Sequence, residues 1–145
     1  MANSARNMYA MNHDAVVNAI IRNGRKRTVI VEGDIGSGKS SMVGMLEKEL
    51  PTHTPCYFDC TTKDLGDMQL PKFKEAEGQD YVRFAPHEEL GIHLDKPIII
   101  MFDEIGKANP AVKNAINGIM LERRLGTKKL HPDSIVFATT NLGAE

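Results

Sequence analysis

The chain has 145 residues, of which 41% are hydrophobic and 26% charged. This balance is typical of one globular domain with its own core and excludes a disordered chain. The formal net charge is -1, so no overall field draws the protein toward nucleic acid or an anionic membrane. Two cysteines are too few for a disulfide scaffold, and without a signal-peptide pattern or a membrane-length apolar run we expect a soluble, cytoplasmic protein.

Strands and helices are predicted to alternate along the chain. Apolar residues at helical spacing predict helices over residues 13–23, over 39–50, and from the cap Asn109 to Gly126. Short β-branched or apolar runs predict strands over residues 28–32, 55–60, 98–102 and 134–138. This alternation predicts βαβ crossovers and a parallel sheet with helices on both faces, which is an α/β fold.

The segment 61–96 interrupts the alternation. It contains Gly66, Pro71, Gly78, Pro86 and Gly91. Glycine and proline at this density leave room only for short elements. We therefore expect an irregular insertion at 61–96 within a single domain that covers residues 1–145.

A glycine-rich segment follows the first predicted strand. It matches the pattern G-x-x-x-x-G-K-[ST] at every fixed position with Gly33, Asp34, Ile35, Gly36, Ser37, Gly38, Lys39 and Ser40. The glycines let consecutive backbone N–H groups turn toward an anion, and the following helix points its positive end there. We predict ATP at residues 33–41, including Ser41, with Lys39 on the β- and γ-phosphates and Ser40 as a Mg²⁺ ligand.

Two adjacent acids, Asp103 and Glu104, follow the apolar strand at 98–102. A buried strand of a parallel sheet emerges at the carboxyl edge, where α/β proteins bind ligands. Asp103 is predicted to hold Mg²⁺, and Glu104 to orient or deprotonate the attacking water. A water-activating Glu favours a hydrolase over a small-molecule kinase, although acids that merely begin a solvated loop remain an alternative.

The last predicted strand also ends in polar residues, and Asn141 is the third of them. If this strand lies between the strand at 28–32 and the strand at 98–102, Asn141 emerges between Lys39 and Glu104. Its amide is then a candidate partner of the γ-phosphate or the attacking water. The alternative is an asparagine that makes only a local turn.

At these motifs the chain resembles an AAA+ ATPase. Residues 33–40 are similar to the Walker A motif, residues 98–104 to Walker B, and Asn141 to the sensor 1 position. The stretch from Asp103 through Ala108, Pro110 and Val112 to Glu122 and Arg123 resembles, more narrowly, the MoxR-like group. The resemblance covers roughly residues 12–145, and it is loose over 61–96, where Tyr81–Leu90 are similar to a short helix and a pore-facing loop.

The resemblance implies a P-loop NTPase three-layer sandwich with sheet order 5-1-4-3-2. It also implies a ring-forming homo-oligomer that uses ATP and Mg²⁺ to remodel another macromolecule, whose identity the sequence does not reveal. The chain stops at Glu145, before the family's fifth strand, arginine finger and helical lid, so we expect a partial domain whose first strand is an edge. Without that arginine we expect slow ATP hydrolysis by the isolated chain.

Two other functions stay open at this point. One is a non-catalytic ATP-binding module, and the other is a DNA-directed ATPase such as a helicase loader. The basic cluster of Arg22, Arg25, Lys26 and Arg27 is interpreted as a solvated turn because no aromatic residues accompany it. Arg123 and Arg124 are interpreted as a solvated helix end, and Cys56 and Cys60 as packed core residues.

Overall fold

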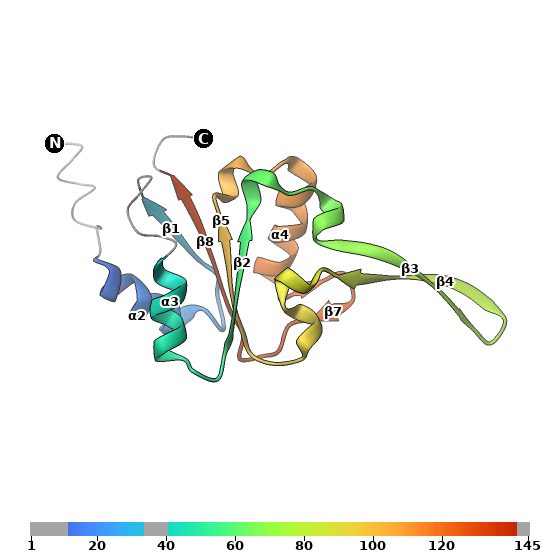
Figure 1. Ribbon diagram of the computed structural model, residues 1–145, viewed down its shortest axis with the longest axis horizontal. Coiled ribbons are helices and arrows are strands. Elements are labelled where there is room, and N and C mark those ends of the chain that lie inside the picture. The colour runs from blue at the N-terminus through green and yellow to red at the C-terminus, as the bar shows by residue number, and fades with distance from the viewer. Residues whose placement is uncertain (1–11, 34–40, 142–145) are drawn as a thin grey trace.

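The computed structural model describes residues 12–33 and 41–141. Its centre is a four-stranded sheet in the order β1-β8-β5-β2, in which every neighbouring pair is parallel (Figure 1). The strands are β1 (Val29–Gly33), β2 (Thr54–Asp59), β5 (Ile98–Asp103) and β8 (Ile135–Asn141). The predicted parallel α/β sheet is confirmed. The last strand, β8, lies between β1 and β5, which are the first and third of the four predicted strands in sequence order.

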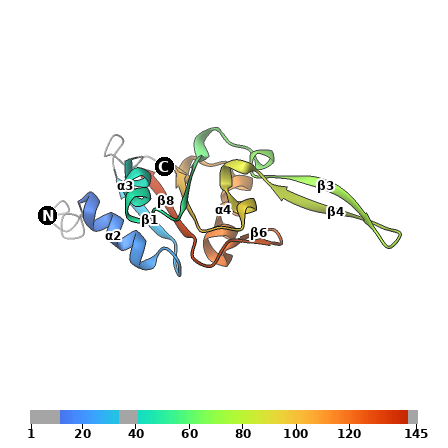
Figure 2. The same cartoon turned by 60° about the horizontal axis from the view of Figure 1, so that its bottom comes forward.

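Helices cover both faces of the sheet, which makes three layers (Figures 1 and 2). The helices α2 (His13–Asn23) and α3 (Ser41–Glu49) pack with Ile99, Met101, Ile135 and Phe137. The helix α4 (Pro110–Glu122) packs with the alternate residues of the same strands, including Ile100 and Phe102. Side chains of β5 and β8 therefore enter two separate cores, as the alternation of a strand requires. The predicted sandwich is confirmed.

Polar caps begin two of the helices, and the cap at Asn109 lies where it was predicted. The Asn12 side chain accepts a hydrogen bond from the Ala15 N–H at 2.8 Å, and Asn109 accepts from the Val112 N–H at 2.9 Å. Each cap satisfies a backbone donor that has no partner inside the helix. None of the helices in the described ranges is both long and apolar enough to cross a bilayer.

The end of α4 differs from the prediction. The helix stops at Glu122, where Arg123 takes a left-handed conformation with φ 60°. Gly126 lies instead in the turn of a small hairpin, β6 (Arg124–Leu125) with β7 (Lys128–Lys129). The prediction that Gly126 ends the helix is wrong because Arg123 itself supplies the positive φ that usually requires glycine.

Arg123 is a structural residue, so its interpretation as a solvated helix end is wrong. Its guanidinium donates to the Gly24 carbonyl at 2.9 Å and also to the Ser134 carbonyl. Burial lowers the pKa of Arg123. The side chain joins the end of α4 to the end of α2 and the start of β8. Arg124, in contrast, pairs with Glu122 at the surface, at 2.8 Å.

A long hairpin replaces the irregular insertion expected at 61–96. The strands β3 (Gln69–Ala76) and β4 (Gln79–Pro86) pair over their whole length and stand away from the body (Figures 1 and 2). The expectation of short elements only is wrong here, and Tyr81 lies within β4 rather than in a helix. The short 3-10 turns that flank the hairpin within the segment are Leu65–Asp67, Glu88–Leu90 and Ile92–Leu94.

Candidate functional site

The predicted site residues on the strands meet at one edge of the sheet. β1 ends at Gly33, β5 at Asp103 and β8 at Asn141. Gly33 is paired with Asn141 in the sheet register, and β5 runs parallel to β8 on the other side. Because the strands are parallel, all three ends lie at the carboxyl edge, where ligands bind in open α/β sheets.

The strand and helix that flank the glycine-rich segment are in place. Gly33 closes β1 and Ser41 opens α3. Residues 34–40 lie outside the described residues, so the phosphate contacts predicted for Asp34, Ile35, Gly36, Ser37, Gly38, Lys39 and Ser40 stay predictions. A strand that leads directly into such a segment and a helix that follows it are the context that the pattern requires.

Two hydroxyl groups hold the Asp103 carboxylate. The Tyr57 hydroxyl donates to Oδ2 and the Thr139 hydroxyl donates to Oδ1, each at 2.5 Å. Burial and this hydrogen bond to Asp103 raise the pKa of Tyr57, so its hydroxyl stays protonated and remains a donor. Since each oxygen has its own donor, the carboxylate plane has a defined orientation at the end of β5.

Thr139 also fixes the backbone at Glu104. Its hydroxyl oxygen accepts the Glu104 N–H at 3.1 Å, and its side chain is fully buried. Glu104 has φ 58° and ψ 50°, a left-handed conformation that is uncommon outside glycine. The chain therefore turns sharply directly after β5, which separates the directions in which the two acids point.

The Glu104 carboxylate lies against the end of β8. The Asn141 side-chain amide donates to both of its oxygens, at 2.7 Å each, and the Lys107 ammonium lies 3.5 Å from Oε2. The predicted neighbourhood of Glu104 and Asn141 is therefore observed, with Asn141 itself buried. The Asn141 amide therefore contacts a residue that follows another strand, in addition to any local turn.

The residues present fit Mg²⁺ bound together with a nucleotide. Mg²⁺ prefers oxygen ligands and is usually held by one or two carboxylates plus phosphate oxygens. Asp103 offers such a carboxylate, and its hydroxyl partners orient it as outer residues orient metal-binding groups. Within the described residues, no three His, Cys, Asp or Glu side chains cluster closely enough to form an all-protein metal site.

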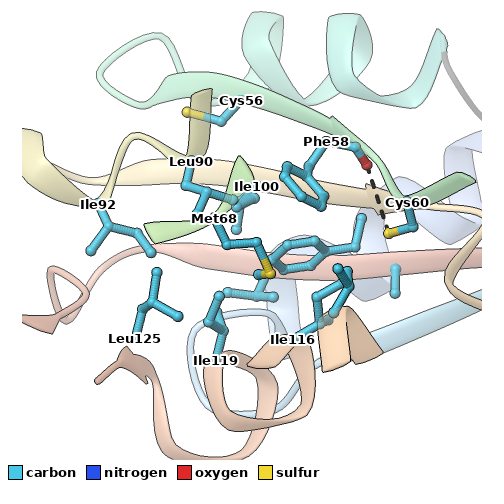
Figure 3. Packing of buried hydrophobic residues seen from close by; sticks show 14 of the residues in the cluster. Cys56, Phe58, Cys60, Met68, Leu90, Ile92, Ile100, Ile116, Ile119 and Leu125 are labelled. Carbon is cyan, nitrogen blue, oxygen red and sulfur yellow. Dashed lines mark hydrogen bonds between the residues drawn. The ribbon is translucent and has the colours of Figure 1, made fainter. Parts of the chain in front are cut away.

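The two cysteines contribute to the core and not to the site. Cys56 and Cys60 are both buried in the core cluster that also contains Leu90 and Met68 (Figure 3). Burial raises the pKa of Cys56 to about 11 and that of Cys60 to about 12. Both groups therefore remain neutral thiols near neutral pH, and their prediction as packed core residues is confirmed.

Sequence reasoning missed Tyr57 and Thr139. Thr139 left a signal, because it is the first polar residue after the apolar start of a buried strand. Tyr57 left none, since a tyrosine in a strand is ordinary. Its role depends on the pairing of β2 with β5, which places Tyr57 on the same side as Asp103.

Comparisons with known proteins give a likeness in fold. No family model matches the chain, and no curated protein matches it. One of the solved structures similar to it is a candidate ATPase from Cytophaga hutchinsonii, with a TM-score of 0.55 and 19% sequence identity. The match covers 90% of this chain and 39% of that one, so the chain spans less than half the length of its neighbour. At this identity the likeness shows the fold alone, which is a three-layer α/β sandwich around a parallel sheet.

Proposed function

We propose that the chain is an ATP-binding and ATP-hydrolysing AAA+ module of the MoxR-like kind. The observation that carries the proposal is the meeting of Asp103, Glu104 and Asn141 beside Gly33, where β1 leads into the predicted phosphate loop. A nucleotide held at residues 33–41 would have its terminal phosphate at this same edge. The similarity in fold to a candidate ATPase agrees with this proposal.

The residues have distinct roles in the proposed reaction. Backbone N–H groups of the loop bind the phosphates, with Lys39 adding a positive charge. Asp103 and Ser40 would hold Mg²⁺, which supplies charge neutralisation at the phosphates when it is bound. Glu104 accepts a hydrogen bond from the attacking water and takes its proton, while Asn141 holds the Glu104 carboxylate in place.

The proposal includes an assembly. By its resemblance to the AAA+ ATPases, the chain acts within a homo-oligomeric ring in the cytoplasm and remodels a macromolecule. The strand β4 overlaps the range Tyr81–Leu90, for which a short helix and a pore-facing loop were predicted, only up to Pro86, and the pore-facing role remains a proposal. Arg123 cannot serve as the arginine that reaches a neighbour's nucleotide, because it is bound to carbonyl groups of its own chain.

The substitution Glu104→Gln tests the central step. It keeps the size of the side chain and one acceptor oxygen for the Asn141 amide but removes the base. We expect binding of a fluorescent ATP analogue to be unchanged and turnover to fall by roughly 10²–10⁴-fold, the usual contribution of a general base. Single-turnover hydrolysis with protein in excess over ATP makes a slow reaction measurable. Glu88→Gln, an exposed acid away from the site, is the matched control.

Each other outcome points to a defined alternative. Equal turnover in Glu104→Gln and the parent chain would remove Glu104 from its assigned role. ATP binding without measurable hydrolysis at any protein concentration would favour the non-catalytic module. Hydrolysis that is stimulated by DNA, together with DNA binding that weakens steeply with salt, would favour the DNA-directed ATPase.

A further inference from the structure

The hairpin of β3 and β4 is a part of the molecule that the proposed ATP site does not use. Its two strands are joined at Glu77 and Gly78, with φ values of 53° and 73° that suit a two-residue turn. From its base the hairpin extends away from the body (Figure 2). A ribbon of only two strands is marginally stable in water, so a further strand at one of its free edges would stabilise it.

The hydrogen-bonding pattern of the hairpin follows from its base. The His87 N–H donates to the Met68 carbonyl at 2.7 Å, so these two residues, which flank the strands, form a hydrogen-bonded pair. Hydrogen-bonded and non-hydrogen-bonded pairs alternate along an antiparallel ladder. Residues of the non-hydrogen-bonded pairs direct their backbone N–H and C=O groups outward, to the free edges. By the sheet register these pairs are Gln69 with Pro86, Pro71 with Phe84, Phe73 with Val82, and Glu75 with Asp80.

The outer edge of β3 is closed to a further strand. Pro71 occupies one of its outward positions, so the N–H that proline lacks is missing at the free edge and not inside the hairpin. Lys72 and Lys74 add charge to the same strand. Proline and lysine are the residues with which natural edge strands avoid further pairing.

The outer edge of β4 is open. Asp80, Val82 and Phe84 each direct an N–H and a C=O outward, and within residues 12–33 and 41–141 the strand β4 pairs only with β3. Tyr81, Val82 and Phe84 have side chains that favour strands, and they are 41%, 46% and 51% exposed. This edge is therefore a template for a third strand.

The open edge is complementary to itself. Two β4 strands that pair antiparallel about Val82 place each Asp80 opposite Phe84 of the other copy and Val82 opposite its own counterpart. Every outward residue then belongs to a hydrogen-bonded pair, in which both N–H···O bonds are exchanged. Since Phe73 lies opposite Val82 within each hairpin, the two copies also form one apolar row of Phe73, Val82, Val82 and Phe73 across the sheet.

Side chains on the other face select the same register. Pairing about Val82 places Tyr81 of each copy opposite Arg83 of the other, which is an attractive cation–π contact. Pairing about Asp80 would place two aspartates directly opposite each other, and pairing about Arg83 two arginines, and like charges in such positions destabilise a sheet. Pairing about Tyr81 would leave Phe84 opposite the turn residue Gly78.

We propose that the outer edge of β4 pairs with the same edge of a second copy of this chain. The result is one antiparallel sheet in the order β3-β4-β4-β3. Because the paired strands are antiparallel, the two hairpins point in opposite directions and the two bodies lie at opposite ends of this sheet. Both copies use the same surface, so the contact is isologous and closes on itself. It is distinct from the contact that would close the proposed ring, and it joins two chains or two rings.

The interface is small. The paired stretch from Asp80 to Phe84 is about 17 Å long, so the dimer is expected to dissociate on dilution. A nucleic acid cannot replace the second copy at this edge, because it has no alternating N–H and C=O groups. The competing occupant is an extended strand of another protein, whereas the second copy already carries the matching side chains.

A pair of proline variants tests which edge is used. Val82→Pro removes an outward N–H from β4, and Phe73→Pro removes the one directly opposite on β3. Neither N–H belongs to the ladder between β3 and β4, so both variants keep the hairpin as Pro71 does. We expect sedimentation velocity to show a reversible dimer for the parent chain and for Phe73→Pro. For Val82→Pro the dissociation constant should rise about 10- to 100-fold, because each copy loses one donor.

Disulfide formation tests the register without a change to the backbone. Residues of a hydrogen-bonded pair have Cα atoms about 5.5 Å apart, within the range that a disulfide spans. We expect mild oxidation of Val82→Cys to give a covalent dimer. Phe73→Cys is the matched control, because the two copies of this position are separated by about 14 Å in the proposed sheet. The native thiols are buried, and the parent chain measures their background reaction.

Three results would overturn the inference. Equal dissociation constants for Val82→Pro and Phe73→Pro would mean that the edge of β4 is not the contact. A covalent dimer of Phe73→Cys would mean that the hairpins meet by their faces. A parent chain that stays monomeric, with no covalent dimer of Val82→Cys, would leave the edge to a strand of another protein. Glu104→Gln should still dimerise, so this inference and the proposed ATP hydrolysis are tested separately.

Discussion

Thr139 places one buried hydroxyl between the two acids that follow β5. It donates to Asp103 at 2.5 Å and accepts the Glu104 N–H at 3.1 Å. Thr139→Val keeps the shape of the fully buried side chain but removes the acceptor of that N–H. We expect the free energy of unfolding to fall by about 1–3 kcal/mol, as for other unsatisfied buried groups. Urea denaturation of the two proteins measures the difference.

Tyr57 provides the matched comparison, because it binds the other oxygen of the same carboxylate. Its side chain is 45% exposed, so water can replace the lost hydroxyl in Tyr57→Phe. We expect this variant to lose less than about 1 kcal/mol of stability. Both variants should weaken Mg²⁺-dependent nucleotide binding by about 10- to 100-fold, as loss of an orienting group commonly does. Equal stability losses in the two variants would contradict this account.

The main groups of the site could be predicted from the sequence, and their orienting partners could not. Asp103 and Glu104 follow an apolar run directly, and Asn141 follows one after two threonines, so their place at the end of a strand is a local property of the chain. The contact of Tyr57 with Asp103 depends on the order of strands in the sheet, which no local pattern specifies. Arg123 was misinterpreted for the same reason, since the carbonyls that it binds are distant in sequence.

At the scale of elements, β2 carries Cys56 into the core, and Cys60 follows it in the 3-10 turn Cys60–Thr62. Burial raises the pKa of Cys56 to about 11 and that of Cys60 to about 12, from 9.0. Below pH 9 both thiols are neutral in the folded and in the unfolded chain, so their full contribution to the free energy of unfolding is present there. Above pH 9 the two thiols ionise first in the unfolded chain, and the free energy of unfolding falls until the thiols of the folded chain ionise as well. We expect a loss of up to about 1.4 kcal/mol per pH unit for each thiol.

Urea unfolding between about pH 8 and about pH 11 measures this slope, because this range begins near the ordinary thiol pKa and extends above it. The double variant Cys56→Ala, Cys60→Ala is the control, because tyrosines and lysines also ionise in this range. We expect the double variant to be less stable at pH 8 but to lose stability more slowly as the pH rises. The same slope in both proteins would mean that the thiols are not the cause.

Most elements were predictable because their signals are local. The apolar periodicity of α2 and the cap at Asn109 each lie within one element, and both placed their helices correctly. The hairpin was missed because Pro71 and Gly78 were taken as breaks. In a two-stranded ribbon, proline is tolerated beside a free edge, and glycine suits the turn. The alternation of Lys72, Phe73 and Lys74 was the available signal.

At the scale of the whole molecule, the proposed ring makes hydrolysis a collective property. Arginines that complete such sites raise the rate by about 10³–10⁵-fold. Arg123 is bound within its own chain and Arg124 is paired with Glu122, so neither provides this group. We expect slow turnover by dilute protein and a rate per chain that rises with concentration if copies assemble. Phosphate release over a wide concentration range measures this, with Glu104→Gln as background, and a fast, concentration-independent rate would contradict the proposal.

The order of strands has a consequence for how the protein is made. β8, near the end of the described chain, lies in the middle of the sheet and pairs with both β1 and β5. While a ribosome is still producing the earlier residues, β1 has no neighbour, and half of the bonding capacity of β5 is open. The sheet can close only after Ile135–Asn141 have emerged, so until then the nascent chain exposes unpaired strand edges that can pair with other chains.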